Sequence, residues 1–546
     1  MTNAQTRRRP TRLLWGVAGI AAGVAVGCGG SSGDSGTDTA RGTFTQVGSL
    51  ATGRVSHAAT LISPSGLVLV VGGKGRSGSS EVVLDSAEIF DPTTGSFAPA
   101  AGTLAGGGKV GASGRMAHSA VALPTGRVLV VGGQTDTVGQ AGLDTCELFA
   151  GASEKFLPVL GNLSEPKSEV LAIPYVAGGT TFVMIAGGRR ADPQSPAAGQ
   201  VSVRTADLYR AQDNRVEPAP SGAQLITGRF GARATLLLSG EYVVQGGVER
   251  PSENAIPTPA GFEVFSFDPA TGVGVFAQSS QELPGDGNAA LNVDRFATDA
   301  AILGENAAVF GGSDDATDPS RALDTIEFYD PTSNSWTVVA ARLATPRHGH
   351  TATRLANGDV LVVGGRSATL PALGTTEIVS GSGVNATVAK GPALRTARRN
   401  HTATLLSNGQ ILIVGGEDAA GVPLAAAEIF ALPGSSVAGG GGGGVTPGGP
   451  DAPSGLSLNP NSGPVGSQVT ISNTSNNFSL TLNQNIVRFN GIVTPVRSGT
   501  ASDLTVTIPN GATTGEVSVQ IGKSVSTMNP TFTVSTGTGG GGTGGG

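Results

Sequence analysis

The sequence is poor in cysteine, aromatic residues and charge. Its 546 residues include two cysteines, 4% aromatic residues and 14% charged residues, and the net charge is −6. Two cysteines cannot build a disulfide framework, so the fold does not depend on one. The negative net charge excludes general nucleic-acid binding, which needs a basic surface. After residue 30 no apolar run approaches the roughly 18 residues that a membrane-spanning helix requires.

Glycine is the residue in excess, with 86 copies. Many glycines with little charge favour tight turns between short strands over helices. The length exceeds that of one ordinary core, so the chain predicts several folded units or one large repeat array.

The N-terminus has the pattern of an export signal. Four arginines within residues 7–12 precede the apolar stretch LLWGVAGIAAGVAV at 13–26, and small residues follow. The motif before Cys28 resembles the lipobox of bacterial lipoproteins, with alanine where that motif usually has leucine. The resemblance implies a signal peptide over 1–27, cleaved so that Cys28 carries a diacylglycerol.

The lipoprotein resemblance also predicts a location. It implies an exported protein, lipid-anchored to the membrane of the bacterial cell envelope, and Gly29 favours the outer membrane or cell surface by that family's sorting rule. The composition of residues 28–42 predicts a flexible tether. An ordinary secretory signal cleaved nearby is the alternative. The sequence does not distinguish export by the twin-arginine route from general secretion. If Cys28 is acylated, Cys146 is left as a free, buried thiol.

Seven glycine pairs divide the middle of the chain. Each ends a short apolar run such as VLVV or ILIV, and successive pairs stand 51–65 residues apart. Apolar runs that do not alternate with polar residues predict strands covered on both faces. The pairs are Gly72 and Gly73, Gly132 and Gly133, Gly187 and Gly188, Gly246 and Gly247, Gly311 and Gly312, Gly364 and Gly365, and Gly415 and Gly416.

Each unit also carries one base and one acid at matching places. The base lies 17–21 positions before the second glycine and the acid 12–19 positions after it. Turns such as DPTTGSF at 91–97 follow the acid, so each unit predicts four strands. The bases are Arg54, Arg115, Lys167, Arg229, Arg295, Arg347 and Arg398, and the acids are Glu88, Glu147, Asp207, Glu263, Glu327, Glu377 and Glu428.

A strand-rich repeat of about fifty residues is typical of kelch propellers. Residues 43–432 resemble that family closely, and the resemblance implies an all-β fold with a seven-bladed kelch β-propeller over 43–434. The family's outer-strand tryptophan is present only as Trp336, and Phe97 and Phe156 substitute elsewhere.

The seventh unit lacks its fourth strand. After residues 425–430 the chain runs into glycines, whereas the segment 42–54 matches 95–107, with Phe44 in the place of Phe97. The N-terminal strand is therefore predicted to complete the last blade and close the ring, which removes an open sheet edge.

A second domain is predicted beyond a glycine-rich linker at 435–452. Alternating segments such as SDLTVTIP then predict a small antiparallel sandwich. Residues 453–535 look like an IPT/TIG domain, since LNPNSGPVGSQVTI, VRFNG and IPNGATTGEVSVQI follow in that family's order. The resemblance implies an immunoglobulin-like β-sandwich used for interaction or spacing. The tail at 536–546 is predicted to be disordered.

Copper chemistry is the enzyme alternative, because galactose oxidase has a kelch-like propeller. Its site uses two tyrosines, two histidines and a cysteine joined to one tyrosine. The tyrosines here are Tyr175, Tyr209, Tyr242 and Tyr329, none beside a histidine. His57, His118, His350 and His401 share one repeat position, three residues after the base, which favours a structural role; His348 alone lies off that pattern. The sequence therefore predicts no copper, no other metal and no cofactor.

Hydrolase motifs are also missing. Between residues 43 and 535 there is no GxSxG elbow, and the chain has no HExxH zinc motif. Asp314 and Asp315 are acids outside the repeat pattern, and they read as a solvated loop rather than a calcium site or an acid pair.

Two interpretations of the role of the seven bases are open. They could surround the mouth of a central channel and attract an acidic ligand. Alternatively they form structural ion pairs, because seven acids match them one to one and buried cations are costly unless paired. We favour the ion pairs.

The function predicted from the sequence is non-catalytic binding of a glycan or a protein partner through the blade loops. The candidate loops are 102–114, 189–201, 248–260 and 277–293. Two alternatives stay open: a carbohydrate oxidase or hydrolase of galactose oxidase-like architecture, and a structural component of an envelope assembly.

Overall fold

The computed structural model describes residues 41–433, 446–447 and 453–535. Short gaps fall at 64, 106–113, 138–141, 152, 178, 193–199, 238, 253–254, 256, 269–270, 279–294, 316–317, 319, 476–477, 479–484, 491, 495, 509–511, 513, 522–523 and 527–528. The predicted signal peptide, Cys28, residues 28–40 of the tether, most of the linker and the tail lie outside the described residues.

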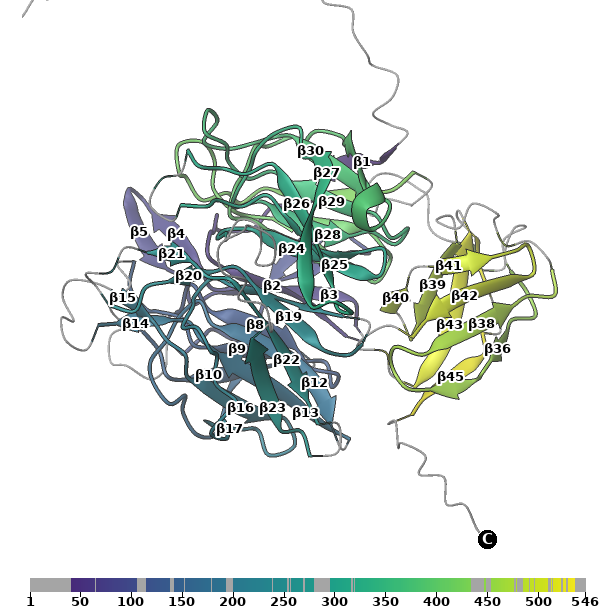
Figure 1. Cartoon of the computed structure of the whole chain (residues 1–546), viewed down its shortest axis with the longest axis horizontal. Helices are drawn as coiled ribbons and strands as arrows, with labels where there is room; N and C mark the ends of the chain where they lie inside the picture. The colour runs from purple at the N-terminus through teal and green to yellow at the C-terminus, as the bar shows by residue number, and fades with distance from the viewer. Residues whose placement is uncertain are drawn as a thin grey trace, which may run out of the picture. The chain divides into compact units, whose positions relative to one another are not determined.

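Strands form nearly all of the regular structure, which confirms the all-β prediction. The single helix among the described residues is a 3-10 turn at Gly383–Asn385. No helix in this part of the chain has the length and apolar character to cross a membrane. In Figure 1 the strands coloured purple to green belong to residues 43–431, and the yellow strands belong to the C-terminal part.

Residues 43–431 contain seven four-stranded antiparallel sheets, numbered here in chain order. Sheet 1 is β2 (Ala58–Ile62), β3 (Leu67–Val71), β6 (Ala87–Asp91) and β7 (Ser96–Pro99); sheet 2 is β8 (Ser119–Ala122), β9 (Arg127–Val131), β10 (Cys146–Ala150) and β11 (Lys155–Pro158). Sheet 3 is β12 (Leu171–Ala177), β13 (Thr180–Ala186), β16 (Ala206–Arg210) and β17 (Arg215–Pro218); sheet 4 is β18 (Arg233–Leu236), β19 (Tyr242–Gln245), β22 (Phe262–Phe267) and β23 (Gly274–Gln278). Sheet 5 is β24 (Asp299–Leu303), β25 (Asn306–Phe310), β26 (Thr325–Asp330) and β27 (Ser335–Arg342); sheet 6 is β28 (Thr351–Arg354), β29 (Val360–Val363), β30 (Thr376–Ser380) and β31 (Thr387–Lys390). Sheet 7 is β32 (Thr402–Leu405), β33 (Ile411–Val414), β34 (Ala427–Ala431) and β1 (Thr43–Gln46).

The second strand of each sheet is the apolar run before a glycine pair. Residues 68–71 and 360–363 are fully buried because sheets pack on both faces of these strands. The hydrophobic clusters accordingly combine side chains of neighbouring sheets, as Val70 of β3 and Leu412 of β33 do.

The first strands of the sheets follow one another in a closed cycle. β2 contacts β8, β8 contacts β12, and the series continues through β18, β24, β28 and β32 back to β2. We call these seven strands the inner ring. Each strand of the inner ring is at an edge of its own sheet.

The glycine pairs lie where one sheet meets the next. The first glycine has φ between 54° and 66° and the second between 84° and 103°. A Cβ on the first glycine would lie less than 3.0 Å from the carbonyl oxygen of the next sheet's base. Gly415 approaches Arg54 in this way, and the N–H of Gly416 donates to the Arg54 carbonyl at 3.0 Å. Only glycine fits both the backbone angle and the close approach.

The N-terminal strand completes sheet 7. β1 pairs antiparallel with β34, Thr43 opposite Ala431 and Gln46 opposite Glu428. Phe44 packs on Phe430 with ring centroids 5.3 Å apart. The same contact joins Phe97 to Phe90 in sheet 1, at 4.8 Å. The first and last described strands of this part are thus direct neighbours.

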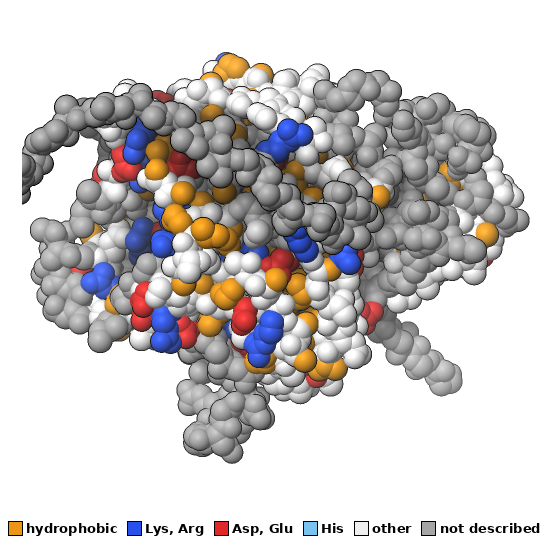
Figure 2. Space-filling view, turned by 90° about the horizontal axis from the view of Figure 1, so that it is seen from above, with side chains coloured by type: hydrophobic (Ala, Val, Ile, Leu, Met, Phe, Trp, Pro, Cys, Tyr) orange, Lys and Arg blue, Asp and Glu red, His pale blue; other side chains and the backbone are white. Residues whose placement is uncertain are grey.

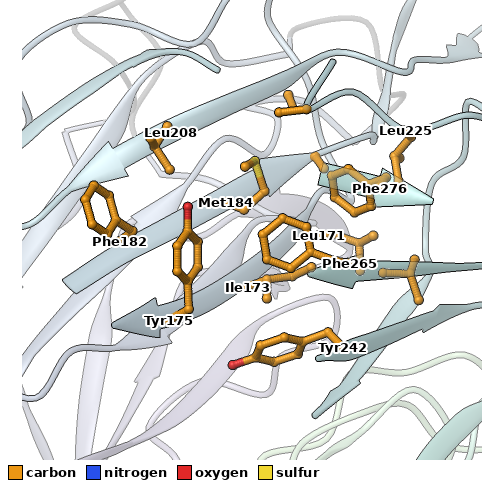
Figure 3. Close-up of a cluster of buried hydrophobic side chains, with 14 of the residues drawn as sticks. Leu171, Ile173, Tyr175, Phe182, Met184, Leu208, Leu225, Tyr242, Phe265 and Phe276 are labelled. Atoms are coloured by element: carbon orange, nitrogen blue, oxygen red, sulfur yellow. The ribbon is translucent and has the colours of Figure 1, made fainter. Parts of the chain in front are cut away.

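Aromatic side chains gather between sheets 3 and 4. Tyr175 stacks on Phe182 at 5.5 Å and meets the edge of Phe265 at 5.5 Å, as Figure 3 shows. Phe276 packs on Phe265 at 4.9 Å. A chain with few aromatics thus concentrates several of them in one core.

The described residues of 446–534 form two sheets around one hydrophobic cluster. Val469 and Leu504 of one sheet pack there with Val487 and Val517 of the other. One sheet is β36 (Ser457–Asn459), β38 (Gln468–Ser472), β42 (Asp503–Thr507) and β41 (Val496–Gly499). The other joins β35 (Thr446–Pro447), β44 (Ser524–Val525), β43 (Gly515–Ile521), β39 (Asn485–Phe489) and β40 (Ile492–Thr494), with β45 (Thr531–Val534) and β37 (Ser462–Gly463) attached. β35 lies within the predicted linker, so residues 446–447 pair with β44 instead of extending freely.

Candidate functional site

Every base of the repeat lies against the acid of its own unit. The ion pairs are Arg54–Glu88, Arg115–Glu147, Lys167–Asp207, Arg229–Glu263, Arg295–Glu327, Arg347–Glu377 and Arg398–Glu428. None of these side chains is more than 6% exposed. The base comes from the segment before the inner strand and the acid from the third strand, so each pair fastens two parts of one sheet.

In sheet 6 every guanidinium nitrogen of Arg347 donates hydrogen bonds inside the protein. Nη2 of Arg347 donates to Glu377 Oε1 at 2.6 Å and to Thr375 Oγ1 at 3.2 Å. Nη1 donates to the carbonyls of Gly364 at 2.8 Å and Thr375 at 3.0 Å, and Nε donates to the Thr345 carbonyl at 3.3 Å. All five guanidinium N–H groups therefore have acceptors, which is the condition for burying this charge.

Both carboxylate oxygens of Glu377 also accept hydrogen bonds from the backbone. Oε2 of Glu377 accepts from the N–H of Ala344 at 2.6 Å and Oε1 accepts from that of Thr345 at 3.2 Å. Glu428 repeats the arrangement with Arg395 and Thr396. Backbone donors and the guanidinium together satisfy the buried carboxylate.

Sheet 3 replaces both partners by shorter residues. Nζ of Lys167 lies 2.7 Å from Oδ2 of Asp207, and it also donates to the carbonyl and the hydroxyl of Thr205. The N–H of Ser164 donates to Oδ1 of Asp207 at 2.8 Å. A lysine and an aspartate thus reach each other where the other sheets use longer side chains.

Burial shifts the titration of these bases. Desolvation lowers the pKa of Arg54, Arg347 and Arg398, and the paired glutamate partly opposes the shift. The guanidinium groups stay protonated at neutral pH, because arginine starts from a very high pKa.

The four repeated histidines pack beside the glycine pairs. His118 of sheet 2 lies against Gly72 of sheet 1, and His57 of sheet 1 lies against Gly415 of sheet 7. Burial, together with a smaller effect of the nearby arginines, lowers the pKa of His57, His118 and His350 to about 3. These histidines are neutral parts of the sheet interfaces.

One repeated feature had no signal in the sequence. The residue two positions after each base has φ between 48° and 68°, although only two of the seven are glycine. Backbone hydrogen bonds of 2.8–3.2 Å join five neighbouring pairs of these residues, for example Ala117 N–H to the Ser56 carbonyl. We call the set the girdle: Ser56, Ala117, Glu169, Gly231, Ala297, Gly349 and Asn400. Left-handed conformations at non-glycine residues cost about 1–3 kcal/mol each and often mark functional regions.

The girdle and the segments after the glycine pairs carry polar side chains of both signs. Glu169 pairs with Arg189 at 2.6 Å, and Arg189 also lies over the ring of Phe230 at 5.3 Å. Glu417 accepts from Arg399 and from Asn400, each at 2.9 Å. On the face drawn in Figure 2, acidic and basic side chains are interspersed among the described residues.

Three of the segments after the glycine pairs form hairpins. These are β4 (Lys74–Ser77) with β5 (Ser80–Val83), β14 (Arg189–Ala191) with β15 (Gln200–Ser202), and β20 (Val248–Glu249) with β21 (Thr258–Pro259). The last two pairs occupy the candidate loops 189–201 and 248–260. Most of the loops 102–114 and 277–293 lies outside the described residues.

The loop acids have local partners. Both oxygens of Asp314 accept from Arg321, at 2.8 and 2.6 Å, and Asp315 accepts from the N–H of Asp318. In the described part of the chain, no three His, Cys, Asp or Glu side chains are grouped so that they could hold a metal ion.

The tyrosines do not fit a copper–radical site. Their hydroxyls donate to Gly272 from Tyr175, to Asn214 from Tyr209, to Pro174 from Tyr242 and to Asn334 from Tyr329. All four rings are at most 6% exposed. Cys146 is buried in the core between sheets 2 and 3, where desolvation raises its thiol pKa to about 12. The described residues therefore lack the exposed tyrosine–histidine set that such a centre requires.

Comparison with known proteins supports a kelch-containing, propeller-like all-β fold. A Kelch motif matches residues 309–341, which include a glycine pair, Glu327 and Trp336. Among solved structures, a fungal alcohol oxidase of the AA5 family in complex with copper is similar, with a TM-score of 0.58 and 13% identity. The match covers 90% of this chain and 99% of that one, and at this identity it shows the fold alone. No curated protein matches the chain.

Proposed function

We propose that this is an exported, lipid-anchored recognition protein whose binding surface is the face carrying the girdle and the hairpins. Its scaffold is a seven-bladed kelch propeller closed by β1, followed by an IPT/TIG domain as spacer or second contact surface. The proposed partner is a glycan or a protein, and the proposed role is non-catalytic.

One observation carries the proposal: the repeated charges are used inside the sheets. Arg347 has no guanidinium N–H left for an external ligand. The girdle and the hairpins carry partly exposed polar groups such as Glu169 and Arg189, and the rigid sheets hold them in place. The resemblance to a copper oxidase concerns the fold and brings no ligand set with it.

Two experiments test the proposal. The mature chain is screened on glycan and peptide arrays, with copper measured in the same sample. Saturable binding that is lost when 189–201 and 248–260 are replaced by short turns supports recognition. Stoichiometric copper with turnover of an alcohol refutes it. Lipid anchoring is tested separately, since labelled fatty acid should enter the wild-type protein and not the Cys28→Ala variant.

A further inference from the structure

The first residues of the seven inner strands occupy equivalent positions, each four residues after its base. Most are small or uncharged, and the two charged ones stand on neighbouring strands, β18 and β24. The set is Ala58, Ser119, Leu171, Arg233, Asp299, Thr351 and Thr402.

Asp299 shows how the inner ring holds a carboxylate. Its Oδ1 accepts from the N–H of Ala300 at 3.0 Å and its Oδ2 from that of Ala352, on the next inner strand, at 2.9 Å. Ala300 and Ala352 are the second residues of β24 and β28. In an edge strand alternate N–H groups point away from the neighbouring strand and are free to bind such a group.

Arg233 lies beside this carboxylate but is only loosely attached to it. Its Nε is 3.5 Å from Oδ1 of Asp299, and its Nη1 is 3.4 Å from the Ala232 carbonyl. Nothing among the described residues accepts from Nη2, and the side chain is 57% exposed. Arg321 is similarly exposed, at 55%, yet both its Nε and its Nη2 bind Asp314.

A backbone donor accompanies Arg233. Ala234 is the second residue of β18 and is therefore equivalent to Ala300 and Ala352. Arg233 is opposite Gln245 in the same register that sets Asp299 opposite Phe310. By the same alternation the N–H of Ala234 points away from β19, one residue along β18 from Arg233.

We propose that Arg233 and the N–H of Ala234 form a binding site for the carboxylate of an external ligand on the inner ring. The ligand carboxylate takes the role that Asp299 takes one sheet further on, accepting from a backbone N–H and from the guanidinium. The site is separate from the hairpins, so it stands or fails independently of the proposed function.

The test compares acetate with chloride at equal ionic strength and neutral pH, using the full chain. Acetate should raise the melting temperature of the wild-type protein more than chloride does, because a ligand of the folded state stabilises it. Arg233→Ala should weaken acetate binding by on the order of tenfold, the value of a charge-assisted hydrogen bond. Arg321→Ala, the matched control, should bind acetate as the wild type does.

Two further arms sharpen the result. Asp299→Asn should tighten acetate binding, since it removes the internal carboxylate that competes for Arg233. Inorganic phosphate should bind no better than acetate. An equal acetate effect in wild type and Arg233→Ala, or no effect in wild type, would overturn the site, and stronger binding of phosphate would overturn its preference for a carboxylate.

Discussion

Nε2 of His57 lies 2.9 Å from Oγ1 of Thr402, although the two residues are 345 positions apart in the sequence. The contact joins the first sheet to the seventh. His401 makes the same contact with Thr351 at 2.9 Å, between sheets 7 and 6. The repeat thus uses a histidine of one sheet and the first inner-strand residue of the preceding sheet.

Ala58→Thr should stabilise the protein. Ala58 occupies the position relative to His118 that Thr402 occupies relative to His57. Its side chain has no hydroxyl to bind the histidine. A new hydrogen bond should add roughly 0.5–1.5 kcal/mol to the free energy of unfolding in urea. Thr402→Ala is the reciprocal variant and should lose a similar amount. The interpretation is wrong if neither substitution changes the urea midpoint.

Stability should fall as the pH drops from about 6.5 towards 3. His57, His118 and His350 have a pKa of about 3 in the folded protein, so unfolding lets them take up protons below the ordinary histidine pKa of 6.5. Each of these histidines should lower the free energy of unfolding by roughly 1.4 kcal/mol per pH unit within this window. Urea midpoints at pH 7, 6 and 5 measure the slope, which His118→Gln should reduce. A midpoint that stays constant between pH 7 and 5 would count against neutral, buried histidines.

Phe44→Ala should destabilise the whole set of sheets. Phe44 is 8% exposed and packs on Phe430, so its truncation leaves a cavity at the joint between β1 and β34. We expect a loss of about 3–5 kcal/mol in urea unfolding. Phe97→Ala, at the matching place within sheet 1, is the comparison. A silent Phe44→Ala beside a costly Phe97→Ala would mean that β1 is dispensable.

Cys146 should be unreactive in the folded protein. Its side chain is 4% exposed and burial raises its pKa to about 12, so the reactive thiolate is scarce at pH 8. With Cys28 replaced by serine, a thiol reagent should react slowly in buffer and rapidly in denaturing urea. Fast reaction in buffer would contradict the burial.

Much of the fold could be predicted because the repeat places its constraints at fixed spacings. Glycine pairs such as Gly72–Gly73 and bases such as Arg54 recur in phase, and the segment around Phe44 matches the strand that the seventh unit lacks. The all-β architecture with many antiparallel sheets is confirmed, and each base lies beside the acid of its own unit.

Other features could not be predicted. The left-handed conformations of Ala117 and Glu169 arise from contacts between sheets, and neither residue type indicates positive φ. The donor capacity of Arg233 depends on its distance from Asp299, which no spacing in the sequence encodes. The short strand at 446–447 lies in a segment whose composition indicated only a linker.

The repeated ion pairs stabilise the sheets from inside, and Arg347→Ala tests this role most directly. The variant leaves the buried carboxylate of Glu377 without its cation, so urea unfolding should show a loss of about 3–5 kcal/mol. Arg321→Ala, which breaks an exposed pair, should change stability by less than about 1 kcal/mol. Wild-type stability of Arg347→Ala together with loss of ligand binding would contradict this structural role and make the bases a ligand site.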